Sequence, residues 1–189
     1  MSELRKDPIL GDWVILAPGR ASRPFDTGNN RSGESSEVCP FCKGNENETP
    51  AAVMTISDDD ADDWAVRVIP NRYSAVTSFD TAATDAGMSE QTAGFIPAPG
   101  YHEVFVESPT HHQAMRELSE SQFSLILQAW RDRLREVSED PAVAHTMIFR
   151  NEGAAAGASL EHVHSQLLAT SFVPTRIDAE HDAGRTYYE

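Results

Sequence analysis

The sequence predicts an α+β fold built around an antiparallel sheet. Strand-like segments outnumber helical ones, and they follow one another without the regular crossover helices that a parallel sheet requires. Alternating or apolar stretches predict strands at residues 13–16, 64–70, 101–107, 145–150 and 162–169. The 189-residue length suits one globular domain with a core, or one domain followed by the beginning of a second.

Two segments are expected to be helical. Residues 119–136 show the apolar spacing of an amphipathic helix. The apolar positions are Phe123, Ile126, Leu127, Trp130 and Leu134. Ser119, with Gln122 three residues later, predicts a capping box at its start. Residues 177–189 have helical propensity.

The remaining segments have the composition of loops. Residues 18–25 carry Arg20 and Arg23, residues 27–37 are polar, and residues 79–99 are rich in Ala, Thr and Gly. The acidic run at residues 58–63 is interpreted as a solvated loop, because it does not follow a calcium-loop spacing.

The net charge of the chain limits the kinds of molecule that it is expected to bind. A formal net charge of −15 disfavours sequence-independent binding to nucleic acids and to anionic membranes. It leaves a nucleotide ligand open, because a few arginines can form a local positive pocket. The sequence contains no apolar run long enough for a membrane span and no signal-peptide core at the first residues. We therefore expect a cytoplasmic protein.

The two cysteines, Cys39 and Cys42, stand at Cys-x-x-Cys spacing. In a cytoplasmic chain this spacing indicates a metal site or a redox pair more often than a structural disulfide.

The segment with the strongest chemical signal is His162-Val163-His164-Ser165-Gln166. In a strand, side chains two residues apart share a face, so the two imidazoles and the carboxamide would project together. The alternative is a partly exposed strand with incidental histidines. The small-residue loop at residues 151–159 runs directly into this strand, and glycines there would let backbone N–H groups approach a phosphate.

These motifs resemble the galactose-1-phosphate uridylyltransferase family, a branch of the histidine-triad superfamily. The superfamily carries His-x-His-x-His, and this branch replaces the third histidine by glutamine, as at Gln166. The branch also has an Asn-x-Gly-Ala-x-x-Gly-x-Ser loop and a Pro-x-x-Gly-x-Trp-Val opening, matched by residues 151–159 and 8–14. Four further motifs fall in family order: Arg20 to Pro24, Cys39 to Cys42, Asn71-Arg72-Tyr73 and Ser108-Pro109-Thr110-His111. One departure is Val163, where many members have proline, but valine suits a strand.

The resemblance implies a catalytic role for two residues. His164 would be the nucleophile that attacks the α-phosphorus of a nucleotide-sugar and forms a nucleotidyl-histidine, with ping-pong kinetics. Gln166 would steady this intermediate, because glutamine forms hydrogen bonds but cannot deliver a proton. Residues expected to line the nucleotide and phosphate site are Arg20, Arg23, Asn71, Asn151, Gly153 and Ser159.

The resemblance also implies a structural zinc site with four protein ligands, Cys39, Cys42, His111 and His162. His112 is the alternative to its neighbour His111, and a metal-free pair of buried thiols is the alternative to the whole site. His102, His145 and His181 are expected to be structural or surface residues.

Family members are nearly twice as long as this chain. The expected organisation is therefore a histidine-triad-like N-terminal domain at residues 1–176 and, at residues 177–189, the start of a connection to a C-terminal domain. The implied reaction exchanges UMP between UDP-glucose and galactose 1-phosphate, in a protein that is a homodimer at full length. Three alternatives remain open. They are an adenylyltransferase of the ADP-glucose phosphorylase type, a zinc-stabilised half-enzyme without activity, and a dinucleotide hydrolase, against which Gln166 argues.

Overall fold

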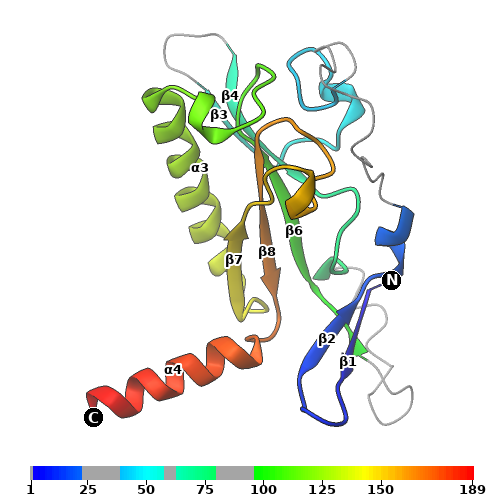
Figure 1. Cartoon of the computed structure of the whole chain (residues 1–189), viewed down its shortest axis with the longest axis vertical. Helices are drawn as coiled ribbons and strands as arrows, with labels where there is room; N and C mark the ends of the chain where they lie inside the picture. Colours follow the sequence, from blue (N-terminus) through cyan, green and yellow to red (C-terminus); the bar gives the residue numbers. More distant parts are fainter. Residues whose placement is uncertain (1, 23–38, 58–62, 80–95) are drawn as a thin grey trace.

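The computed structural model describes residues 2–22, 39–57, 63–79 and 96–189. Its centre is a five-stranded antiparallel sheet with strand order β3-β4-β6-β8-β7, and helix α3 (Glu120–Ser138) lies against one face of it (Figure 1). The strands are β3 (Met54–Ser57), β4 (Trp64–Pro70), β6 (Gly100–Val106), β7 (His145–Phe149) and β8 (His164–Thr170). The predicted α+β class with an antiparallel sheet is confirmed.

The main core lies between the sheet and α3. Alternate residues of β4, β6 and β8 point to this side, because successive side chains of a strand face opposite ways. Fully or almost fully buried members are Val66, Val68, Phe105, Leu167 and Ala169 from the strands, with Ile126, Ala129 and Val137 from α3. The opposite face of the same strands is therefore left for the pocket described below.

Helix α3 begins where the sequence predicts. Ser119 is its N-cap, and the side-chain oxygen accepts a hydrogen bond of 3.1 Å from the backbone N–H of Gln122. The side chain of Gln122 has other partners than the capping box predicts. Its Nε2 donates to the carbonyl oxygens of Ala65 and Glu107. The start of the helix is thus tied to the sheet.

A second, three-stranded sheet has the order β2-β1-β5 and lies beside the large sheet (Figure 1). Its strands are β1 (Glu3–Lys6), β2 (Trp13–Leu16) and β5 (Ile96–Pro97). One of its links to the main body is the hydrogen bond of 3.1 Å from Ser2 N–H to Thr77 Oγ1. The hydrogen bond of 3.2 Å from Ala98 N–H to the Ser2 carbonyl extends the pairing of β1 with β5. After β2 a short 3₁₀ helix, η1 (Pro18–Ser22), carries Arg20 toward the loop that follows β4.

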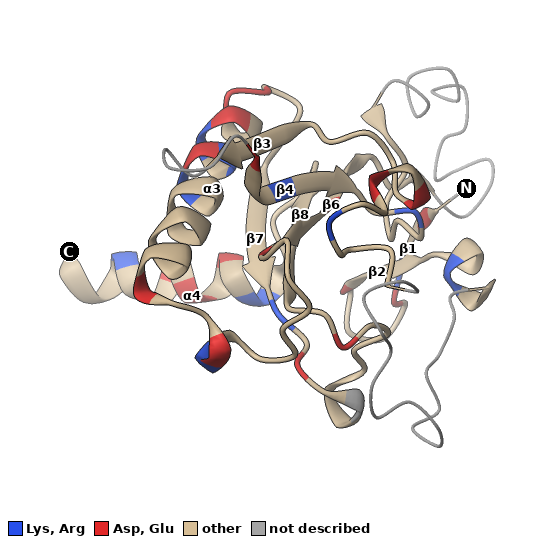
Figure 2. Cartoon of the chain, turned by 90° about the horizontal axis from the view of Figure 1, so that it is seen from above, with Lys and Arg blue, Asp and Glu red and all other residues tan. Residues whose placement is uncertain are grey.

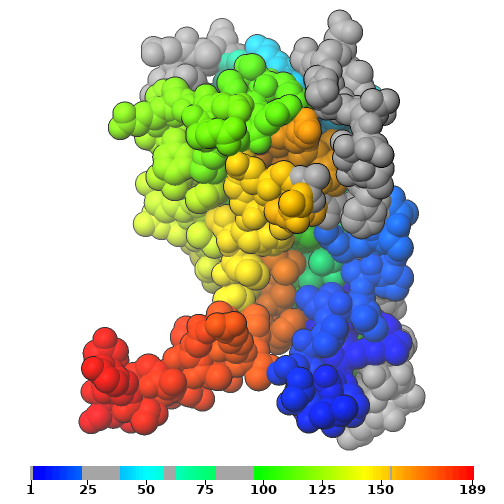
Figure 3. Space-filling model, viewed as in Figure 1, coloured from blue at the N-terminus to red at the C-terminus, as the bar shows by residue number. Residues whose placement is uncertain are grey.

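Helix α4 (Thr175–Tyr188) occupies the region where residues 177–189 were expected to be helical. It extends away from the globular body, and it contains no buried residue (Figure 3). Charged residues are frequent along α3 and α4, whereas β7 and β8 contain no Lys, Arg, Asp or Glu (Figure 2). No helix in the described part of the chain has the length and apolarity needed to span a bilayer.

The structure departs from the expected elements in four places. The strand predicted at residues 162–169 starts at His164, so His162 precedes it. The short strands β1 and β3 were not predicted, and the end of the expected loop at residues 79–99 forms β5. Most of that loop, residues 80–95, and most of the acidic run, residues 58–62, lie outside the described residues.

A buried ion pair ties α3 to β6. Arg133 Nε donates to Glu103 Oε2 at 2.7 Å, and the two side chains are only 9% and 5% exposed. Arg133 also pairs with Glu136 at 2.7 Å. These carboxylates raise the pKa of the Arg133 guanidinium, Glu103 first, so the guanidinium is charged at neutral pH.

We predict that Arg133→Met lowers the free energy of unfolding by about 3–5 kcal/mol, because it leaves the Glu103 carboxylate buried without its counter-charge. Urea denaturation measures the change. Arg131→Met is the matched control on the same helix. Arg131 pairs with Asp132 while its side chain is 54% exposed, so this substitution should leave the stability almost unchanged. Equal effects of the two substitutions would contradict the assignment.

Candidate active site and metal centre

A pocket lies on the face of the sheet opposite α3. Its lining includes Ile69 from β4, Val104 from β6, and His164 and Gln166 from β8. The loop after β4 contributes Asn71, Arg72 and Tyr73, while the cysteine-containing turn and the segment after it contribute Pro40, Phe41, Glu48, Thr49 and Pro50. The lining is completed by Pro70, at the end of β4, and by Ser159 and Leu160, just before the histidine segment. The pocket is therefore assembled from segments that are far apart in the sequence.

The two residues expected to be catalytic are neighbours on the pocket face of β8. His164 is 6% exposed, and its Nδ1 lies 2.7 Å from the backbone carbonyl oxygen of His162. A carbonyl oxygen can only accept, so Nδ1 carries the proton of the neutral imidazole. The lone pair of the ring is then on Nε2, which is the nitrogen able to attack an electrophile.

Gln166 lies one strand repeat beyond His164 and is 3% exposed. Its Oε1 is 3.0 Å from Nε2 of His102 and 3.3 Å from Nδ2 of Asn71. Asn71, expected at the nucleotide site, thus lines the pocket and contacts Gln166 directly. His102, expected to be only structural or at the surface, is 6% exposed and belongs to the same polar group.

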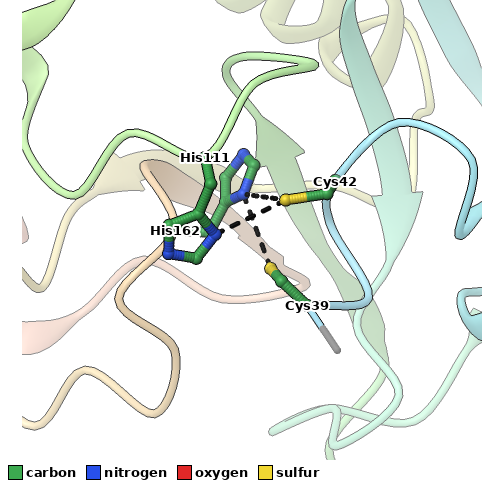
Figure 4. Close-up of side chains that lie close together, drawn as sticks. All are labelled: Cys39, Cys42, His111 and His162. Carbon is green, nitrogen blue, oxygen red and sulfur yellow. Dashed lines mark hydrogen bonds between the residues drawn. The ribbon is translucent and has the colours of Figure 1, made fainter. Parts of the chain in front are cut away.

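The residues expected to bind a metal converge beside the pocket (Figure 4). The potential ligand atoms of Cys39, Cys42, His111 and His162 all lie within 4.8 Å of one another. The Nδ1 of His162 is 3.5 Å from Cys39 Sγ and 3.6 Å from Cys42 Sγ, and the Nδ1 of His111 is 3.4 Å from Cys42 Sγ. A tetrahedral zinc site, with Zn–S near 2.3 Å and Zn–N near 2.0–2.1 Å, separates sulfur from nitrogen by about 3.5 Å. The spacing fits a metal of this kind.

The surroundings of the cluster also suit a cation. Burial, and secondarily the adjacent Cys39, raises the pKa of Cys42 to about 12, and burial lowers the pKa of His162 to about 4. Without a cation the cluster holds a protonated Cys42 thiol and a neutral His162 ring, whereas a bound cation would stabilise thiolates. Nε2 of His162 donates to the Ser108 carbonyl at 2.9 Å, which leaves the Nδ1 lone pair directed at the sulfurs.

The two adjacent histidines of the 108–112 segment point in different directions. His111 joins the cysteines, whereas Nδ1 of His112 is 3.8 Å from the Glu117 carboxylate. The carbonyl of His112 accepts a hydrogen bond of 2.7 Å from the N–H of Val163. Val163, which stands where many family members have proline, is 1% exposed and uses a donor that proline lacks.

Phe41 lies between the cysteine turn and the histidines at the start of strand β8. Its ring makes edge contacts with His162 and His164, with centroid distances of 5.9 and 5.5 Å. Phe41 stands between the two cysteines, so the position of the turn determines the packing on the His164 ring. The cluster and the pocket therefore share one wall.

The remaining expected binding residues are distributed unevenly. Ser159 lines the pocket, and Arg20 Nη1 donates to the Tyr73 carbonyl at the end of the pocket loop. Asn151 donates to the Ala156 carbonyl at 2.8 Å, and Gly153 has a φ of +79°, so both shape the small-residue loop and are not among the pocket-lining residues. Arg23 lies outside the described residues.

Sequence reasoning did not single out several residues of the site. Phe41 and Arg72 were noted only as motif positions, and Glu48 and Thr49 not at all. The position of Phe41 between Cys39 and Cys42 was a usable signal, since a metal-binding turn fixes the side chain between its ligands. His102 shares the face of Val104 by strand alternation, and that signal was also available.

Comparison with known proteins agrees with this geometry. Residues 1–174 match the family described as galactose-1-phosphate uridyl transferase, N-terminal domain. ADP-glucose phosphorylase of Arabidopsis thaliana is 35% identical over 99% of the chain and 54% of its own length. Galactose-1-phosphate uridylyltransferase of Thermotoga maritima is 28% identical over 100% of the chain and 53% of its length. The chain therefore spans about half the length of these curated relatives.

Solved structures give the same result. The A. thaliana ADP-glucose phosphorylase with bound ADP-glucose superposes with a TM-score of 0.67 at 31% identity, covering 100% of this chain and 55% of that one. A uridylyltransferase structure superposes with a TM-score of 0.68 at 28% identity, covering 98% of this chain and 51% of that one. With the family match over most of its length, the chain belongs to the galactose-1-phosphate uridyl transferase N-terminal domain family.

Proposed function

We propose that this chain carries the nucleotidyl-transfer site of a UDP-glucose–hexose-1-phosphate uridylyltransferase. The observation that carries the proposal is the hydrogen bond from His164 Nδ1 to the His162 carbonyl. It keeps the proton on Nδ1, so the lone pair of Nε2 is available as a nucleophile in a residue that lines the pocket. The substrates would be UDP-glucose and a hexose 1-phosphate such as galactose 1-phosphate. The reaction would proceed in two displacements through a uridylyl-histidine.

In the first displacement Nε2 of His164 attacks the α-phosphorus of UDP-glucose. An N–P bond forms, the bond from phosphorus to the bridging oxygen breaks, and glucose 1-phosphate leaves with the electron pair. In the second, a phosphate oxygen of galactose 1-phosphate attacks the same phosphorus and the N–P bond breaks. The His162 carbonyl holds the Nδ1 proton throughout and would stabilise the positive charge that the ring gains.

Gln166 would contact the phosphoryl group of the intermediate without supplying a proton. A sugar phosphate is a good leaving group, because its second ionisation has a pKa of about 6, so it needs little protonation. Asn71, Ser159, Arg20 and Arg23 would bind the nucleotide and its phosphates, and the loop containing Asn151 and Gly153 would offer backbone N–H groups. The pocket positions of Asn71 and Ser159 support this assignment.

We further propose that Cys39, Cys42, His111 and His162 hold a structural Zn²⁺ ion. The ion would supply a cross-link between the cysteine turn, the 108–112 segment and the residues before β8. Four protein ligands leave no open position for a water or substrate. The observation that supports the site is the sulfur-to-nitrogen spacing of 3.4–3.6 Å.

A second candidate is adenylyl transfer from ADP-glucose, with inorganic phosphate as the acceptor. It is favoured by the identity with the A. thaliana ADP-glucose phosphorylase, 35% against 28% for the T. maritima uridylyltransferase. The nucleophile and the intermediate are of the same kind in both candidates. Only the base and the acceptor differ.

We propose that the domain at residues 1–176 is followed in the whole protein by a second domain, reached through residues 177–189, and that the whole protein is a cytoplasmic homodimer. The coverage of about half of each relative and the projecting helix α4 support the second domain. In that case the isolated chain would carry the nucleophile but need the second domain for full turnover.

We expect the purified chain to gain the mass of one uridylyl group after incubation with UDP-glucose, and His164→Ala to abolish the gain because the nucleophile is lost. Intact-mass spectrometry measures this, with ADP-glucose in parallel. An adenylyl adduct alone would assign the second candidate. His181→Ala, an exposed histidine of α4, is the control that should react normally. If neither donor forms an adduct, the idea that the isolated chain can carry out the first displacement is contradicted.

Gln166→His should increase hydrolysis of the nucleotide sugar relative to transfer by about 10-fold or more, because imidazole can act as a general acid or base where the amide cannot. The ratio of free nucleoside monophosphate to exchanged sugar phosphate, measured by chromatography, reports the effect. An unchanged ratio would refute the proposed role of the glutamine.

The chain should contain about one zinc ion, and His111→Ala should lose most of it and lower the melting temperature, because one of four ligands is removed. Elemental analysis and thermal melting measure both effects. His112→Ala is the matched control, since its ring lies outside the cluster. Equal zinc content in the two variants would disprove the ligand set.

A further inference from the structure

We propose that His102 is a positioning residue for nucleotidyl transfer: it fixes the side-chain amide of Gln166 so that the NH₂ group faces the pocket. The inference rests on the proposed function of His164 and Gln166. It assigns a role to a buried histidine that is neither the nucleophile nor a metal ligand.

The direction of the first hydrogen bond is set by the backbone. The N–H of Ala75 lies 2.9 Å from Nδ1 of His102, and a backbone N–H can only donate. Nδ1 therefore accepts, and the proton of the neutral ring is on Nε2. That N–H points at Gln166 Oε1, 3.0 Å away.

A second backbone group sets the direction of the Asn71 contact. The N–H of Tyr73 donates to Asn71 Oδ1 at 2.9 Å, so the other end of this amide is the NH₂ group. Nδ2 of Asn71 then donates to Gln166 Oε1 at 3.3 Å. The 3.2 Å approach between Asn71 Nδ2 and His102 Nε2 follows from two donors converging on one oxygen.

These two donors determine how the amide of Gln166 is turned. If it rotated by half a turn, its NH₂ group would face the N–H groups of His102 and Asn71, and buried donors would lose their acceptor. Gln166 and His102 are 3% and 6% exposed, so water cannot easily replace the lost partner. The oxygen is thus held against β6, and the NH₂ group is directed away from it.

A glutamine needs this restraint because the two ends of its amide have nearly the same shape and opposite hydrogen-bonding character. A phosphoryl group on His164 has only acceptor oxygens. The NH₂ end stabilises it, whereas the oxygen end repels it. His102 therefore selects the orientation that suits an anionic intermediate.

The sheet register brings the two side chains together. Val104 is paired with Gln166 and His102 with Leu168, so His102 and Gln166 are diagonal neighbours on the pocket face of β6 and β8. The ring of Phe149, on β7, lies at 6.4 Å from the ring of His102 and limits its movement. The contact is built on regular strands and is correspondingly rigid.

Two substitutions separate the contact from a general packing role. In His102→Asn the side-chain oxygen can still accept from Ala75 N–H, but the side chain is too short to reach Gln166. In His102→Gln the terminal NH₂ group replaces Nε2–H as donor to Gln166. At saturating nucleotide sugar we expect His102→Asn to slow adduct formation on His164 about 10-fold, and His102→Gln to stay within about 3-fold of the wild type. The nucleotide-sugar concentration that gives half of the maximal rate should change little.

The Gln166→Ala background supplies the coupling test. There, His102→Asn should have no further effect on the rate, because its target is absent. A full 10-fold effect in that background would overturn the proposal. So would equal rates for His102→Asn and the wild type, or equally slow rates for the Asn and Gln variants with unchanged melting temperatures.

A measurement on the resting chain keeps the inference separate from the proposed function. Nitrogen-15 relaxation of the Gln166 side-chain amide should show a restrained group in the wild type and in His102→Gln, and a more mobile one in His102→Asn. If the wild type forms no adduct, the proposed function fails, and this comparison still decides the positioning role. Equal mobility in all three proteins would overturn it.

Discussion

Strand β8 is paired along both edges, with β6 on one side and β7 on the other, and this double pairing fixes its register. A shift by one residue would turn His164 and Gln166 into the core beneath α3 and bring Ser165 and Leu167 to the pocket. The core face resists such a shift. Leu167 is fully buried, and Ser165 donates to the buried carboxylate of Glu107 at 2.6 Å. The chemistry of one face thus depends on the packing of the other.

The segment just before β8 adds a second constraint. His162 contributes its ring to the cysteine cluster and its backbone carbonyl to Nδ1 of His164. A movement of the cluster that shifts the His162 backbone would therefore disturb the hydrogen bond that fixes the tautomer and the direction of the His164 imidazole. Phe41 reinforces the link, because it packs on both histidine rings from the cysteine turn. A metal at this place would act on the reaction only through the position of His164.

The local pattern predicted much of this arrangement, and long-range pairing explains the rest. Strand alternation correctly placed His164 and Gln166 on one face, and the Cys39–Cys42 spacing indicated a metal site or a redox pair. Strand alternation did not show that His162 lies before the first residue of the strand. His111, which joins the cysteine cluster, is 69 residues from Cys42, so only the order of family motifs suggested it as a metal ligand. The role of His102 depends on the register between β6 and β8, which no single segment encodes. β1 and β3, four residues each, are too short for a clear period.

The role of His164 is tested by identifying the nitrogen atom to which phosphorus becomes attached. Phosphorus and nitrogen-15 NMR on the chain with labelled histidine, after reaction with UDP-glucose or ADP-glucose, identifies that atom by its one-bond coupling. Because the His162 carbonyl holds the Nδ1 proton, we predict attachment to Nε2 of His164. Attachment to Nδ1, or to any other histidine, would contradict it.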